Sequence, residues 1–150
     1  MHGMPENWPE TKMNLKEIYD FMNAERLGVL TTAANSGQPQ AALMGFAVTP
    51  ELELIFDTVR SSRKYPNLKQ NPRVAWVVGC TTEVTVQYEG EAEELEGAAL
   101  TKYKPIYFQK FTDGPARENW DGMTYFAVRP KWVRYCDYNP GTRRIEEHRF

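Results

Sequence analysis

The sequence of 150 residues has the composition of an ordinary globular domain and almost no net charge. Hydrophobic residues make up 41% of it and charged residues 25%, which suits one domain with its own core over residues 1–150. The net charge of −2 excludes a broad basic field, so we expect no nucleic-acid partner, and any anion must be bound locally. No apolar run approaches the ~20 residues that cross a bilayer, and residues 1–11 lack an export signal. We therefore expect a cytoplasmic protein without a membrane partner.

The first half of the chain predicts one helix, three strands and a second, shorter helix. Asn14 and Glu17 form a capping box, and apolar residues at helical spacing continue the first helix to about Glu25. Three segments of β-branched or alternating apolar residues then predict strands separated by turns, over residues 27–33, 39–48 and 52–58. Residues 61–70 predict the short helix, which Asn71 and Pro72 end.

The second half of the chain predicts further strands around one longer helix. These strands lie over residues 74–78, 84–93, 124–128 and 132–138. In the second of them apolar and polar residues alternate, and Gly90 suits a bulge. Residues 97–111 predict the helix, with a break at Pro105. Residues 1–12 and 142–150 are predicted to be peripheral or flexible tails.

These elements predict a mainly β fold, an antiparallel β-barrel of six or more strands with peripheral helices. The strands follow one another through short turns and are not separated by regular helices, which disfavours a doubly wound parallel sheet. A closed barrel also leaves no free sheet edge to protect.

The sequence offers little for metal or disulfide chemistry. Cys80 and Cys136 are isolated and belong to no CxxC pair, so we expect reduced thiols in the core or at a subunit interface. The two histidines, His2 and His148, stand at opposite ends of the chain. A zinc site therefore has almost no ligands, and we predict no metal centre.

One stretch of the sequence has the residue types of a phosphate site. A strand ends at Thr58, and Ser61 or Ser62 is placed to cap a helix whose first turn holds Arg63 and Lys64. A helix start offers unpaired amides, and the two cations add a bidentate and a point-charge contact to an anion. The alternative is that the serines only cap the helix and the cations are solvated surface charges. Spacing alone does not distinguish the two interpretations.

A wider pattern of residues resembles a known family. It consists of Phe56-x-Thr58, Ser62-Arg63-Lys64, Leu68, Asn71-Pro72-x-Val74-Ala75 and Gly90-Glu91-Ala92-Glu93. In order and spacing this pattern resembles the FMN-binding split-barrel family related to pyridoxamine 5′-phosphate oxidase, over about residues 27–138. The resemblance implies a split-barrel fold and a homodimer with flavin at the subunit interface.

The same resemblance implies where FMN would bind. Arg63 and Lys64 correspond to the pair that holds the FMN phosphate. The other positions that the resemblance places at the cofactor are Leu43, Met44, Gly45, Phe46, Phe56, Asp57, Thr58, Ser62 and Thr85. Small groups along residues 41–46 would let a flat ring lie close to the strand backbone, although the same residues also suit plain barrel core.

Two other cofactors bind to split barrels. The deazaflavin F420 would keep the same phosphate site, so it remains an alternative to FMN. Haem would need an axial ligand, for which only His148, near the C-terminus, is a histidine candidate, so haem is disfavoured.

The sequence departs from the namesake oxidases where they bind their substrate. Those enzymes carry an arginine near the start of the second strand, where this chain has Ala42, and a tryptophan in the last strand region, where it has Tyr135 or Cys136. The Arg-x-His sequence that follows in the oxidases is also missing. We therefore expect a flavin site without oxidation of pyridoxamine phosphate.

The predicted function is that of a small FMN-dependent oxidoreductase, which passes electrons from a nicotinamide donor to a small organic acceptor. The alternative is a non-catalytic flavin-binding module for electron transfer, storage or sensing. Because flavin supplies the electron chemistry itself, no catalytic side chain is nominated. An aromatic stretch that ends at Trp120 could roof the ring, or could serve helix packing and a dimer interface.

Overall fold

The computed structural model describes residues 14–150, and the predicted N-terminal tail with His2 lies outside the described residues. Four helices are α1 (Leu15–Ala24), α2 (Lys64–Gln70), α3 (Gly97–Lys110) and α4 (Gly114–Arg117). Eight strands are β1 (Leu27–Ala33), β2 (Pro39–Gly45), β3 (Ala47–Val48), β4 (Leu54–Val59), β5 (Arg73–Val78), β6 (Val84–Glu94), β7 (Met123–Asp137) and β8 (Arg144–Arg149). None of the described helices has the length and apolar character needed to span a membrane.

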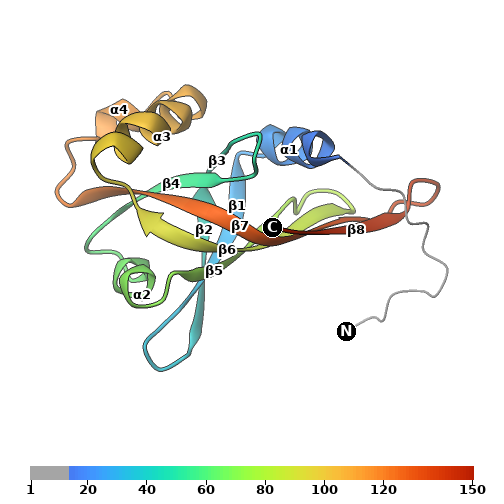
Figure 1. Ribbon diagram of the computed structural model, residues 1–150, viewed down its shortest axis with the longest axis horizontal. Coiled ribbons are helices and arrows are strands. Elements are labelled where there is room, and N and C mark those ends of the chain that lie inside the picture. Colours follow the sequence, from blue (N-terminus) through green and yellow to red (C-terminus); the bar gives the residue numbers. More distant parts are fainter. Residues whose placement is uncertain (1–13) are drawn as a thin grey trace.

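All eight strands belong to one antiparallel sheet. Its order is β2-β1-β5-β6-β7-β4-β3, and β8 pairs with β7 outside this path. Figure 1 shows the sheet curled on itself, with α3 and α4 together at one side and α2 at the opposite side. The mainly β, antiparallel fold with peripheral helices is therefore confirmed.

The predicted strand over residues 39–48 is divided into β2 and β3 at Phe46. These two strands are the opposite ends of the sheet order, so the chain passes from one end to the other through this residue. The Phe46 side chain is fully buried, with its ring 5.7 Å from that of Trp76. Burial of this ring holds the corner that brings the two ends of the curled sheet together.

The main core fills the inner face of the curled sheet. Along β5, exposed residues alternate strictly with the buried Val74, Trp76 and Val78, as expected for a strand with one face in the core. The Phe56 ring lies 5.6 Å from that of Trp76 and stacks at 5.4 Å on that of Phe126. Aromatic packing of this kind dominates the energetics of a small core.

A second core cluster joins α3 to strands β3, β4 and β7. Tyr107 and Phe111 are buried and stacked at 4.8 Å, and both belong to a cluster with Tyr125. The helix-packing interpretation of the aromatic stretch is thus confirmed for these residues. Trp120, at the end of the same stretch, is 57% exposed in the connection to β7.

Several local predictions are confirmed. The Asn14 side chain accepts a hydrogen bond from the Glu17 amide at 3.0 Å and caps α1. The register of β6 against β7 shifts between Glu89 and Gly90, where a bulge was expected. Cys136 is buried, whereas Cys80 is exposed after β5, and both are free thiols. Burial raises the pKa of the Cys136 thiol.

Three predicted boundaries are wrong. Helix α3 continues through Pro105, because Tyr107 and Phe111 anchor it to the sheet strongly enough to offset one missing hydrogen bond. Residues 124–128 and 132–138 form the single strand β7, in which Pro130 pairs with Gly90 beside the register shift, where the ladder is already interrupted.

The third correction concerns the C-terminal segment. Residues 142–150 are predicted to be a tail, but most of them form β8, which pairs with β7 from Trp132–Arg149 to Asp137–Arg144. Most residues of β8 are charged or polar, so the strand has no hydrophobic alternation that would predict it. It is formed by backbone hydrogen bonds to β7, and a pattern of neighbouring residues does not show such a distant partner.

Candidate functional site

The loop between β4 and α2 is fixed by two threonines. Thr124 Oγ1 donates to the carbonyl oxygen of Thr58 at 2.5 Å, and Thr58 Oγ1 donates to Ser62 Oγ at 2.9 Å. The predicted serine cap is wrong, because α2 begins at Lys64 with Arg63 as its N-cap and without a side-chain capping bond. Ser62 is instead held by Thr58, and its own hydroxyl hydrogen is left for an outside acceptor.

Arg63 and Lys64 lie against the β1–β2 hairpin. Together with Leu30, Thr32, Gln40, Ala41 and Ala42 they line a hollow of about 50 Å³. Neither cation forms an ion pair or hydrogen bond with another residue in the part of the chain that the structure describes. Burial lowers the pKa of Lys64 because the ammonium loses water without gaining a carboxylate. Two cations without a partner among the described residues make this hollow a candidate anion site, which we call the anion hollow.

Two of the predicted cofactor residues lie away from this hollow, on the outer face of the sheet. Thr85 is on β6, three places from β2 in the sheet order, and its Oγ1 donates to the Val78 carbonyl oxygen at 3.1 Å. Leu43 is 62% exposed. It pairs with Val29, which pairs in turn with Val77, so the three side chains form one row across the outer face.

Four more predicted positions are used inside the protein. Phe46 and Phe56 are fully buried against Trp76. The Asp57 carboxylate accepts from Arg117 Nη2 at 3.2 Å, which joins β4 to α4. Met44 packs partly buried against the main core. The structure therefore brings Thr58, Ser62, Arg63 and Lys64 together and directs these side chains elsewhere.

At Gly45 a flat ring does lie against the strand, but it belongs to the protein. A Cβ atom at Gly45 would come within 2.8 Å of the Phe111 ring. The Arg26 guanidinium lies 4.5 Å from the centre of that ring, and the Lys110 ammonium lies 4.4 Å from the centre of the Phe46 ring. The small residue at position 45 is thus explained by the packing of Phe111.

Lys110, the last residue of α3, lies over the Phe46 ring after β2 and has a lowered pKa. Its Nζ donates to the Glu25 carbonyl oxygen. Burial lowers the pKa of Lys110 to about 8, and the nearby Arg26 charge lowers it further than the Glu25 charge raises it.

This shift predicts that stability rises with pH above about 8. Between the lowered pKa of folded Lys110 and the ordinary value of 10.5, the unfolded chain binds more protons than the folded protein. In Lys110→Met the unfolding free energy should lose this rise relative to the parent, by about 1 kcal/mol after allowance for solvent screening. Chemical unfolding from pH 7.5 to pH 10 measures it.

The rise ends near pH 10, where tyrosines of the unfolded chain begin to ionise, because burial raises the pKa of Tyr125 in the folded protein to about 12. Lys102→Met, which changes an exposed lysine of the same helix, is the control. Parallel pH profiles for the Lys110 variant and the parent would contradict the prediction.

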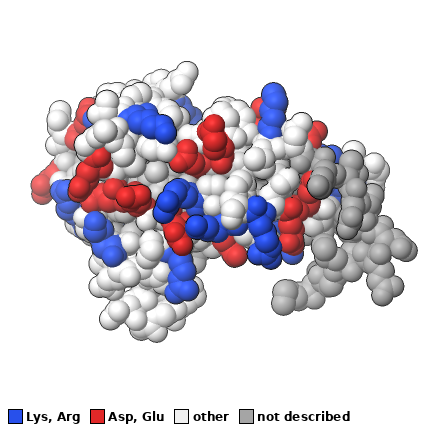
Figure 2. Space-filling view, in the orientation of Figure 1, with Lys and Arg blue, Asp and Glu red and all other residues white. Residues whose placement is uncertain are grey.

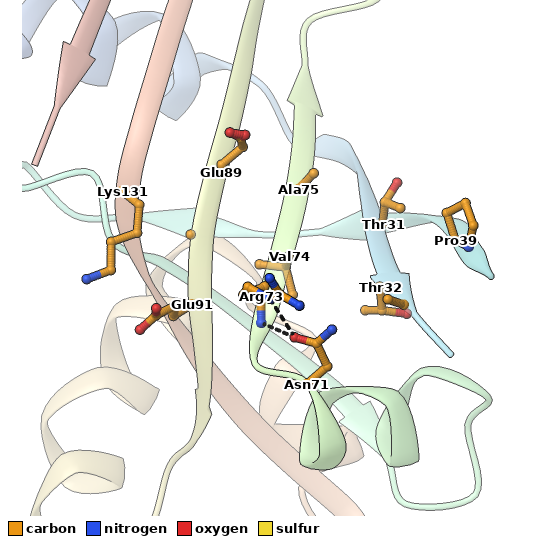
Figure 3. A pocket seen from close by; sticks show the side chains of 12 residues that line it. Thr31, Thr32, Pro39, Asn71, Arg73, Val74, Ala75, Glu89, Glu91 and Lys131 are labelled. Carbon is orange, nitrogen blue, oxygen red and sulfur yellow. Dashed lines mark hydrogen bonds between the residues drawn. The ribbon is translucent and has the colours of Figure 1, made fainter. Parts of the chain in front are cut away.

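A larger hollow of about 470 Å³ lies on the outer face over β1, β5 and β6 (Figure 3). Its walls carry both charges, with Arg73 and Lys131 against Glu89 and Glu91. Arg73 Nε donates to Asn71 Oδ1 at 3.2 Å. The volume falls within the ~300–1,000 Å³ of small-molecule sites. The sequence did not indicate this hollow because its lining residues come from separate strands that meet only in the sheet.

The curled antiparallel sheet is that of a split β-barrel, and the two cations beside its β2 edge mark a candidate anion site. The family model described as pyridoxamine 5′-phosphate oxidase matches residues 15–137. The chain therefore belongs to this family, as the sequence pattern indicated.

Solved structures agree with this assignment. The conserved hypothetical protein Rv2991 of Mycobacterium tuberculosis is 26% identical, with a TM-score of 0.71 over 91% of this chain and 90% of that one. General Stress Protein 26 of Bacillus anthracis is 25% identical, with a TM-score of 0.70 over 92% of this chain and all 100% of that one.

A heme binding protein of Mycobacterium smegmatis is 17% identical, with a TM-score of 0.77 over 93% of this chain. The chain covers only 59% of the length of that protein. No curated protein matches the chain.

Proposed function

We propose that the protein binds FMN and acts as an oxidoreductase, which passes electrons from a nicotinamide donor to a small organic acceptor. The observation that carries this proposal is the anion hollow, where Arg63 and Lys64 meet the β1–β2 hairpin without a carboxylate partner among residues 14–150. Ser62 directly precedes the two cations and is held by Thr58. Each charge-assisted contact contributes ~1.5–3 kcal/mol, so together they can hold a phosphate dianion at micromolar concentration. Bound flavin would supply the electron and hydride chemistry.

The predicted cofactor residues that lie away from the hollow would contact a flavin at a subunit interface or through their backbone atoms. Leu43 and Thr85 face outward from the sheet, so they would meet a flavin only between two subunits. Phe46, Phe56 and Asp57 offer backbone atoms, because their side chains are used in the core or by Arg117. A ring held along the β2 edge would be compatible with both sets.

The residues at the site do not favour pyridoxamine phosphate as the substrate. Ala42 lines the anion hollow where the namesake enzymes carry an arginine, and it has no group to bind a second phosphate. Cys136 is buried in β7 and is followed by no Arg-x-His sequence. We propose that pyridoxamine phosphate is turned over far more slowly than by a dedicated oxidase.

The decisive experiment is to identify what the purified protein carries. The absorbance spectrum and the mass of the released ligand distinguish FMN from F420, and steady-state oxidation of NADH or NADPH with a panel of acceptors tests for turnover. Bound FMN with turnover supports the oxidoreductase. Bound FMN with negligible turnover supports a non-catalytic module, and a melting temperature indifferent to excess FMN contradicts FMN binding, since a hundredfold excess over Kd adds ~2.7 kcal/mol.

Haem is the second candidate, favoured by one observation at the C-terminal strand. His148 Nε2 is buried, forms no hydrogen bond with the residues from 14 to 150 and lies 3.9 Å from Glu146 Oε1. A neighbour of the same fold is a heme binding protein. An imidazole nitrogen without a hydrogen bond is a candidate axial ligand, and haem would have to displace the atoms that cover it. A Soret band that disappears in His148→Ala would establish haem in place of flavin.

The proposed assembly is a homodimer that uses the outer face. Leu27, Leu43 and Val77 are the large apolar side chains exposed there, at 43%, 62% and 43%. A second copy is the occupant we propose, because an apolar row beside the mixed-charge hollow is self-complementary across a twofold axis. The cytoplasmic location also stays a prediction.

Val77→Arg should therefore convert the dimer into monomers. Burying an unpaired guanidinium in each half of the interface should weaken association by at least about a hundredfold. Light scattering coupled to gel filtration measures the mass across a dilution series. Gln109→Arg, on the exposed surface of α3, is the control and should remain dimeric; a dimeric Val77→Arg would place the interface elsewhere.

A further inference from the structure

One buried amide connects α2 to both strands of the β1–β2 hairpin. Asn67 is only 6% exposed. Its Nδ2 donates to Thr32 Oγ1 at 3.0 Å and to Gln40 Oε1 at 2.9 Å. Both hydrogens of the amide are thus used, one on each strand. This contact holds the start of α2, with Arg63 and Lys64, at a fixed distance from β2.

The direction of these hydrogen bonds determines which atoms remain for an occupant of the anion hollow. Thr32 and Gln40 both line the hollow. Because Gln40 accepts through Oε1, its amide nitrogen carries two hydrogens that have no acceptor among residues 14–150. Thr32 likewise accepts through Oγ1 and keeps its own hydroxyl hydrogen. Each oxygen thus accepts from Asn67, which leaves the hydrogens of both side chains available to the hollow.

We propose that Asn67 is a positioning residue that turns the hydrogens of Gln40 and Thr32 toward the anion hollow, where both are further ligands of a phosphate monoester. This inference rests on the proposed function, since the phosphate is that of the bound flavin. Gln40 and Thr32 add neutral donors beside the two cations, and a tetrahedral oxyanion can accept from all of them.

The competing interpretation is that Asn67 is only a structural latch for α2. Two substitutions separate the interpretations because they change polarity and not size. Gln40→Glu keeps an oxygen for the Asn67 amide and replaces the remaining donor with a second oxygen. Asn67→Asp replaces both donated hydrogens with acceptors, so that Thr32 and Gln40 must turn their donors toward Asp and away from the hollow.

The test compares the Kd of FMN with that of riboflavin, which lacks the phosphate, by titration of flavin fluorescence. The parent should prefer FMN by at least about a hundredfold. In Gln40→Glu and Asn67→Asp this preference should fall at least tenfold, while the Kd of riboflavin stays within about threefold. Gln38→Glu adds the same charge at an exposed turn position and should keep the parental preference.

A second probe keeps the two proposals separable. Inorganic phosphate should raise the melting temperature of the parent more than chloride of equal ionic strength, and less in Gln40→Glu. A parent that binds FMN or phosphate, with the preference unchanged in folded Gln40→Glu, overturns the role of Asn67 alone. A parent that responds to phosphate but not to FMN upholds Gln40 and Thr32 as phosphate ligands and overturns the flavin. A parent that prefers neither phosphate probe overturns both. If Asn67→Asp does not fold, Gln40→Glu decides, because in that variant Asn67 can still donate to both Thr32 and residue 40.

Discussion

Replacing both Arg63 and Lys64 with alanine should weaken FMN binding by about 10²–10⁴-fold and leave the fold intact. The two side chains are the cations that line the anion hollow, and each charge-assisted contact to a phosphate is worth ~1.5–3 kcal/mol. Their removal should cost little stability, since neither makes an ion pair among the described residues. Loss of the partly desolvated Lys64 ammonium also removes a charge whose pKa is lowered by burial.

Equilibrium titration of the apo-protein with FMN measures the effect, and circular dichroism establishes that the variant is folded. The matched control is the double variant Arg60→Ala with Lys69→Ala, which removes the same two residue types on either side of the site. Arg60 is exposed, and Lys69 lies 3.5 Å from Glu94 on the side of α2 that faces β6. Unchanged affinity in the folded Arg63–Lys64 variant would exclude the anion hollow as the phosphate site.

The parts of the fold that the sequence predicted are those with local causes. The Asn14 cap, the alternation along β5 and the shift at Gly90 each depend on residues within a few positions of one another. The corner at Phe46 depends instead on Trp76, thirty positions away in the sequence, whose ring lies 5.7 Å from it. Strand β8 depends on its ladder with β7 in the same way.

In the candidate site, too, the local part was predicted from the sequence and the long-range part was not. Ser62, Arg63 and Lys64 are adjacent in the sequence, so their residue types together with the surrounding family pattern indicated an anion. The opposite wall of the hollow comes from the β1–β2 hairpin, and Gln40 meets Asn67 across 27 positions of sequence. A lone asparagine in a polar helix carries no signal of such a contact. Only its burial to 6% exposure shows that its amide is used.

The second large effect is expected at Gly90, in the long strand pair of the barrel. An added Cβ there would lie 2.4 Å from the Arg129 carbonyl oxygen, 2.8 Å from Val128 Cγ1 and 2.9 Å from Tyr88 Cε1. None of these atoms can move cheaply. The carbonyl belongs to the β6–β7 ladder, and the Tyr88 hydroxyl donates to the Leu52 carbonyl oxygen at 2.8 Å and to that of Val128 at 3.2 Å.

Gly90→Ala should therefore lower the unfolding free energy by at least about 3 kcal/mol, at the upper end of what overpacking costs. For a chain of this size that corresponds to a fall in Tm of roughly 6–12 °C. Gly37→Ala is the control, because Gly37 has a positive φ of 88° but open space around its Cβ position. It should lose only about 1 kcal/mol, the ordinary penalty of backbone conformation. Thermal unfolding of both variants distinguishes crowding from backbone strain, and equal losses would show that the strand pair can open around the added methyl group.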